Sequence, residues 1–115
     1  MMKGRKMQAT LAGCTVLAFA LGTGALGTRG ADDKTVKLFH DKCSVCHGDD
    51  GHGSDVGKQL DVADLHSPEV QKQTDEQLIN AVTNGKGKMP PNKGKLTADQ
   101  IKSLVGYVRE LGKQK

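Results

Sequence analysis

The sequence contains no tryptophan, and its 115 residues include only two phenylalanines and one tyrosine. It has a single long apolar stretch, close to the N-terminus, which excludes a membrane protein with several spans. The length allows one domain and excludes a large multi-domain enzyme. Few large apolar side chains are therefore available to build a core.

The N-terminal segment has the layout of a secretory signal peptide. Three basic residues precede an uncharged apolar run over 11–26, and small residues follow. These small residues place the cleavage site before Thr28, with an alternative site before Ala31. We expect residues 1–27 to be the signal peptide and residues 28–115 to be a mature domain exported to the periplasm.

Two other uses of this leader stay open. It could be retained uncleaved as a membrane anchor, although its uncharged stretch is short for a spanning helix and contains several glycines. The segment Leu11-Ala-Gly-Cys14 resembles a lipoprotein box. Such a box ends an apolar region, however, and this one begins it.

The mature domain is small, polar and nearly neutral. Loss of the three leader lysines and arginines lowers the net charge from +4 to +1, which does not suit a nucleic-acid binder. Only 26 of the 88 residues in 28–115 are apolar. A domain of this size and composition is marginal with a purely protein core, so we expect a disulfide, a metal or a cofactor to complete the interior.

The two cysteines of the mature domain indicate which group this is. They lie in Cys43-Ser-Val-Cys46-His47, and C-x-x-C-H is the attachment signature of c-type haem. Two thiols one helical turn apart can add to the two vinyl groups of one porphyrin edge, and the next residue, His47, then reaches the iron. Export fits this interpretation, because covalent haem attachment takes place outside the cytoplasm.

Other interpretations of the cysteine pair are a thioredoxin-like redox motif, a simple disulfide and half of a zinc site. A thioredoxin fold needs alternating strands and helices, and the sequence pattern has none. A zinc site needs a second ligand pair at short spacing, which His40, His52 and His66 do not provide. We interpret these three residues as surface histidines.

Met89 is the candidate for the second iron ligand. The other three methionines lie in the leader, so Met89 is the only one in the mature domain. It lies in a loop of glycines, lysines and prolines, where a thioether has no apolar neighbour in the sequence. We predict that Met89 binds the iron opposite His47; the alternative is an exposed loop methionine.

These motifs resemble those of the small class I cytochromes c, the soluble His/Met monohaem electron carriers of bacteria. The resemblance covers residues 33–112 and rests on Phe39, Cys43-Ser-Val-Cys46-His47-Gly48, Asp64-Leu65, Asn84-Gly-Lys-Gly-Lys-Met89-Pro90 and Leu104-Val-Gly-Tyr107-Val. It implies an all-α class I cytochrome c fold of four to five short helices around one covalently bound haem c. It also implies that Cys43 and Cys46 form the thioethers and that His47 and Met89 are the axial iron ligands.

The chain departs from this family at two positions. Thr35 stands where family members often have glycine at the crossing of the terminal helices, and we expect Gly106 to compensate. Ala63 stands where family members often have proline. The sequence therefore leaves open which backbone carbonyl accepts the Nδ1–H of His47.

Local patterns predict helices independently of this resemblance. A first helix, capped by Asp32 or Asp33, leads into the cysteine motif. A Ser-Pro pair at 67–68 begins a short helix, and capping boxes at 74–77 and 97–100 begin two more. Glycines from Gly48 onward predict a long loop, and no strand or internal repeat is evident.

The predicted function is electron transfer by a haem whose two axial positions are filled, and not enzymatic catalysis. A haem peroxidase would need an open iron position or a second haem, and a thiol–disulfide module would contain no haem. We expect a monomer that meets a membrane only transiently and exchanges electrons with proteins such as an oxidase, a reductase or a donor dehydrogenase. A positive rim around Met89 suits acidic partners, unless it is only a solvated loop; it consists of Lys86, Lys88, Lys93 and Lys95.

Overall fold

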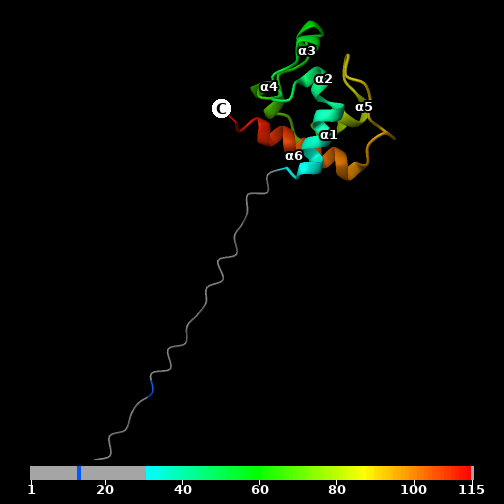
Figure 1. Ribbon diagram of the computed structural model, residues 1–115. Helices are drawn as coiled ribbons and strands as arrows, with labels where there is room; N and C mark the ends of the chain where they lie inside the picture. Colours follow the sequence, from blue (N-terminus) through cyan, green and yellow to red (C-terminus); the bar gives the residue numbers. More distant parts are fainter. Residues whose placement is uncertain (1–12, 14–30, 115) are drawn as a thin grey trace, which may run out of the picture.

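The computed structural model describes residue 13 and residues 31–114. Gly13 apart, the predicted signal peptide over residues 1–27 lies outside the described residues. The described part of the chain has no β-strand and forms six helices: α1 (Asp33–Lys42), α2 (Ser44–His47), α3 (Asp55–Gln59), α4 (Pro68–Gln71), α5 (Asp75–Asn84) and α6 (Ala98–Leu111) (Figure 1). The predicted all-α architecture is confirmed. Within the described residues, no helix has both the length and the hydropathy needed to cross a membrane.

Side-chain caps begin the helices at the positions that the sequence predicts. The carboxylate of Asp32 accepts a hydrogen bond of 2.8 Å from a backbone N–H in the first turn of α1. Ser67 caps α4, and Pro68 occupies its first turn. Thr74 and Thr97 form complete capping boxes with the glutamines three residues later, at α5 and α6. Each cap satisfies a backbone donor that has no partner within the helix.

Two short helices, α2 and α3, are additional to the four that the local sequence patterns predict. α2 is separate from α1 because Cys43, with φ −116° and ψ −33°, interrupts the regular helix. α3 lies inside the segment predicted as a long loop, where Ser54 caps it by accepting a hydrogen bond of 2.9 Å from the N–H of Gly57. The five residues of α3 are too few, and too polar, for an apolar stripe to predict them.

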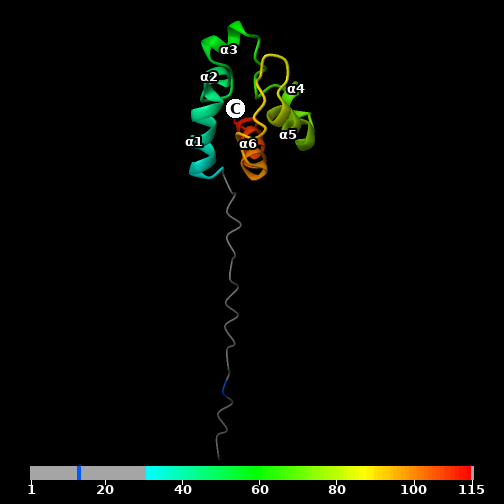
Figure 2. The ribbon, with the colours of Figure 1, turned by 90° about the vertical axis from the view of Figure 1, so that its right-hand side faces the viewer.

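The core forms where α1 and α5 pack against α6. The rings of Phe39 and Tyr107 meet edge to face, with centroids 5.0 Å apart and an interplanar angle of 74°. Seven buried residues make up the core cluster: Phe39, Leu65, Val70, Leu78, Leu104, Val105 and Leu111. Turned by 90°, Figure 2 shows α1, α2 and α3 on one side of α6, and α5 with the segment that follows it on the other.

The helix crossing tolerates Thr35 without help from Gly106. Thr35 is buried, with 6% of its surface exposed. Gly106 is exposed, and a Cβ built on it meets no atom within 4 Å. The expectation that Gly106 compensates for the larger residue is therefore wrong, because Gly106 makes no close approach that a side chain would prevent.

Candidate functional site

The candidate haem ligands Cys43, Cys46 and His47 lie together where α1 passes into α2. The backbone N–H groups of Cys46 and His47 both donate to the carbonyl of Cys43, at 3.2 and 2.9 Å. Both thiols are half-buried and free. Burial raises the pKa of the Cys43 thiol to about 11, so this sulfur is protonated at neutral pH until it reacts.

The chain that follows α2 satisfies the carbonyl groups at the end of this short helix. The N–H of Gly53 donates to the carbonyl of His47 at 2.7 Å, and the N–H of Ser54 donates to that of Cys46 at 3.0 Å. The Ser54 hydroxyl donates to the carbonyl of Val45 at 2.6 Å. These bonds replace the partners that a helix end lacks, and so they hold the segment carrying both cysteines in place.

Gly57 allows α3 to approach α2 closely. It is buried, and a Cβ built on it would lie 1.8 Å from the carbonyl oxygen of Cys46, well inside van der Waals contact. Any residue larger than glycine would push the two helices apart. Sequence reasoning missed this position, because the glycine lies in a segment read as a loop.

The two ring nitrogens of His47 have different surroundings. Nδ1 is buried and has no hydrogen-bond partner among the described residues. Burial lowers the pKa of His47, and the backbone of Ala63 acts in the opposite direction, from a position outside normal hydrogen-bond geometry. Ala63 is therefore the backbone group beside the ring, but it does not form the hydrogen bond to Nδ1 whose acceptor the sequence left open. Because Nδ1 is buried, Nε2 is the ring nitrogen that can bind a metal.

Met89 lies half-buried in a closed turn after α5. Lys86 and Met89 exchange both backbone hydrogen bonds, at 3.2 and 3.0 Å. The turn requires glycine, because Gly85 and Gly87 have φ values of +77° and +58°. A Cβ on Gly85 would also lie 2.5 Å from the carbonyl oxygen of Met89. Both glycines therefore shape the loop that carries Met89.

The segment then returns to the end of α5. The side-chain amide of Asn92 donates to the carbonyl of Val82 at 3.0 Å, and the N–H of Lys93 donates to that of Thr83 at 2.9 Å. Figure 2 shows this segment, in yellow, standing across the molecule from α2. The two candidate axial ligands thus belong to opposite sides of the fold.

The lysines on this segment form a positive surface. All four are exposed, and none takes part in an ion pair with another described residue. They are the lysines of the predicted rim: Lys86, Lys88, Lys93 and Lys95. The segment 48–66 contains five aspartates and only one lysine, so the acidic and basic groups lie in different stretches of the chain.

The donor set of the described residues fits a c-type haem. It comprises two free thiols one turn apart, an imidazole with a buried Nδ1, and a single thioether in a rigid polar turn. Sulfur and imidazole nitrogen are the ligand types that hold haem iron in His/Met sites, and paired cysteines are the residues to which the porphyrin is attached.

Known proteins with similar sequences and structures point the same way. The family described as cytochrome C oxidase, cbb3-type, subunit III matches residues 30–108. Cytochrome c6 of Leptolyngbya boryana is 40% identical over 72 residues, which are 63% of this chain and 82% of that protein. Cytochrome c6 of Nostoc sp. strain PCC 7120 is 34% identical over 103 residues, which are 90% and 87% of the two chains. The solved structure of the KustC0563 c-type cytochrome is 37% identical, with a TM-score of 0.64 over 69% of this chain and 98% of that one.

Proposed function

Because this chain belongs to the small class I monohaem cytochromes c, which carry a covalently bound haem c, we propose that it is a periplasmic electron carrier. The observation that carries this proposal is the placement of Cys43, Cys46 and His47 on one short, firmly held helical segment. When bound, the haem supplies the Fe(III)/Fe(II) couple through which an electron enters and leaves.

The residues of the α1–α2 junction hold the porphyrin in this proposal. Cys43 and Cys46 form the two thioether bonds, and His47 binds the iron through Nε2. The hydrogen bonds from Gly53 and Ser54 to the end of α2 support this role, since they limit the movement of the attachment segment between oxidation states. A ligand set that barely moves keeps electron transfer fast.

Met89 is the second axial ligand in this proposal. Its turn, closed by two backbone hydrogen bonds and stiffened by Pro90 and Pro91, holds the thioether in one place. A thioether ligand raises the reduction potential relative to a second histidine. With both axial positions filled by protein, the iron has no position left for a substrate, and so the protein is a carrier and not a haem enzyme.

The proposed partners are redox proteins with acidic docking surfaces. The four exposed and unpaired lysines beside Met89 support this choice, because a positive rim accelerates encounter with an acidic surface. The proposed route to these partners is export. In that proposal the leader over residues 1–27 is removed, by cleavage before Thr28 or Ala31, and the monomeric domain acts in the periplasm.

Carbon monoxide binding distinguishes an electron carrier from a haem enzyme. Carbon monoxide binds ferrous haem only where an axial position is open. Adding it to the dithionite-reduced wild-type protein at pH 7 should therefore not change the visible spectrum. The variant Met89→Ala should bind it readily. Rapid carbon monoxide binding by the wild type would contradict the proposal and favour a ligand-binding protein or a peroxidase.

A further inference from the structure

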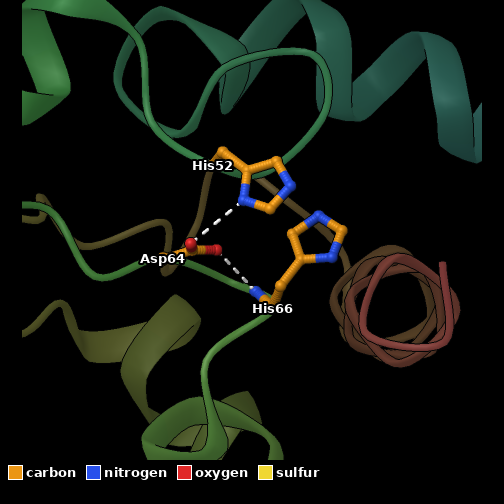
Figure 3. A group of neighbouring side chains, drawn as sticks. All are labelled: His52, Asp64 and His66. Carbon is orange, nitrogen blue, oxygen red and sulfur yellow. Dashed lines mark hydrogen bonds and ion pairs between the residues drawn. The ribbon is translucent and has the colours of Figure 1, made fainter. Parts of the chain in front are cut away.

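Two histidines and one aspartate meet on the loop segment between α2 and α4, and none of them is a candidate haem ligand. One ring nitrogen from each of His52 and His66 and one carboxylate oxygen of Asp64 lie within 4.8 Å of one another. Figure 3 shows the two rings face to face, with Asp64 beside them; their centroids are 3.8 Å apart and their planes differ by 9°. His52 is exposed, as predicted, whereas His66 is half-buried; nothing in the sequence predicted that the two rings would meet.

Hydrogen bonds fix each member of this cluster. His52 Nδ1 lies 3.0 Å from one carboxylate oxygen of Asp64, and the other oxygen accepts a hydrogen bond of 2.8 Å from the backbone N–H of His66. The Nε2 of His66 lies 2.6 Å from the carbonyl oxygen of Asp50, which can only accept. These bonds hold a carboxylate and two imidazoles close together on the loop segment.

The backbone beneath the cluster is also fixed. The N–H of Leu65 donates to the carbonyl of Gly51 at 2.9 Å, which joins the two stretches that carry the histidines. Gly51 is buried, and with φ +82° its backbone is one that glycine adopts without strain. A Cβ there would lie 3.1 Å from Leu111 and 3.3 Å from Leu65. The ligand-bearing residues therefore extend from a backbone anchored on the core.

We propose that His52, Asp64 and His66 form a binding site for Zn²⁺ that is separate from the haem. Two imidazole nitrogens and one carboxylate oxygen are a ligand set that zinc accepts, with water completing a tetrahedron on the exposed side. Ligands at ordinary zinc distances stand about 3.3 Å apart in a tetrahedron, and His52 Nδ1 and Asp64 already stand 3.0 Å apart. Binding needs a tilt of the two stacked rings and a shift of their protons to the opposite nitrogens.

The charges around the cluster favour a cation. The negative charges of Asp50 and Asp64 both act on the histidines. Lys58 is the one basic group among these charges, and its effect on the pKa of His52 is smaller than that of either aspartate. The carboxylate of Asp64 raises the pKa of His52, so protons compete with the metal in acid solution. Zinc binding should accordingly weaken as the pH falls, and we would measure it at pH 7.5.

His40 provides a matched control. It is exposed, and its two nitrogens lie 3.5 Å from Asp41 and Asp49. It is another histidine next to acidic groups, but it is not part of the cluster. If histidine and acid alone were enough for zinc to bind, His40 would contribute as much as His52 or His66.

Calorimetric titration of the haem-loaded protein with zinc sulfate tests the proposal. We expect one zinc per chain in the wild type, affinity at least tenfold weaker in His52→Gln and His66→Gln, and affinity within twofold of the wild type in His40→Gln. The visible haem spectrum of each variant should stay that of the wild type. Unchanged binding in both cluster variants, or an equal loss in His40→Gln, would overturn the proposal.

A second measurement uses the wild type alone and so does not depend on how a variant folds. In NMR spectra of the reduced protein, one equivalent of zinc should shift the ring signals of His52 and His66 and leave those of His40 in place. Ring signals of His52 and His66 that stay unmoved at saturating zinc would refute the site.

Discussion

At the scale of single residues, Gly57 determines whether the attachment segment can keep its position. Replacing it with alanine places a Cβ against the Cys46 carbonyl, which is backbone and cannot rotate away. We expect Gly57→Ala to lower the free energy of unfolding of the haem-loaded protein by about 2 kcal/mol or more, as overpacking does. Guanidinium unfolding followed by far-UV circular dichroism measures this loss.

Gly106→Ala is the matched control for that measurement, because it makes the same change where a Cβ meets nothing. Alanine is favoured over glycine inside an exposed helix, so this variant should be about 0.5–1 kcal/mol more stable than the wild type. If Gly57→Ala proved as stable as Gly106→Ala, the close approach of α3 to α2 would be refuted.

Site residues that lie close together in the sequence could be predicted, because one chemical requirement sets their spacing. Site residues that only the fold brings together could not. The cysteine motif is readable because thioether attachment to one porphyrin edge sets its spacing, and Met89 because no other methionine remains in the mature domain. Their roles as haem ligands stay predictions. The meeting of His52 with His66 had no such signal, since fourteen positions separate them and they come together only through folding, by bonds such as the one between Gly51 and Leu65.

At the scale of the helices, the cap of α1 gives a prediction about pH. Hydrogen bonds from Thr35 to the Asp32 carboxylate lower its pKa below the usual 3.8. A carboxyl whose pKa is lower in the folded protein contributes stability that is fully present above the unfolded pKa and is lost as the pH falls through the folded one. Asp32→Ala should therefore be less stable than the wild type at pH 7, and this difference should shrink as the pH falls below about 4.

The variant Asp32→Asn separates the contribution of the capping hydrogen bond from that of the negative charge. Asparagine caps a helix about as well as aspartate but does not titrate in this range, so its stability relative to Asp32→Ala should stay constant from pH 7 to pH 3. Thermal unfolding of the three proteins across this range gives both comparisons. A difference between the wild type and Asp32→Ala that persisted unchanged at pH 2 would show that the negative charge of Asp32 does not contribute to the cap.

Four of the described helices, α1, α4, α5 and α6, could be predicted from the sequence, whereas α3 and the break between α1 and α2 could not. α5 and α6 combine a capping box with regularly spaced apolar residues, and both begin where expected. α3 has a cap, Ser54, but no stripe, because it packs through Gly57 and has no large side chain in the core. The interruption at Cys43 has no sequence signal either, since the residues around it fit one continuous helix.

At the scale of the whole molecule, the small core predicts that folding depends on the haem. The core cluster of the described residues holds seven buried side chains, supported by a few partly buried ones. That is little apolar burial against the conformational entropy of a chain of this length. The double variant Cys43→Ser with Cys46→Ser, made without haem, should lose most of the helical far-UV signal of the haem-loaded protein. A cooperative thermal transition in this apo form would show that the protein core suffices.

The central claim is that Met89 and His47 hold the iron of an electron carrier, and the far-red spectrum of the oxidised protein tests it most directly. Methionine bound to ferric haem gives a weak charge-transfer band there. We predict this band in the wild type, its loss in Met89→Ala and Met89→His, and a lower midpoint potential in both variants, because a thioether favours Fe(II). A wild-type spectrum without this band, or a Met89→Ala protein that keeps the band and the potential, would contradict the account.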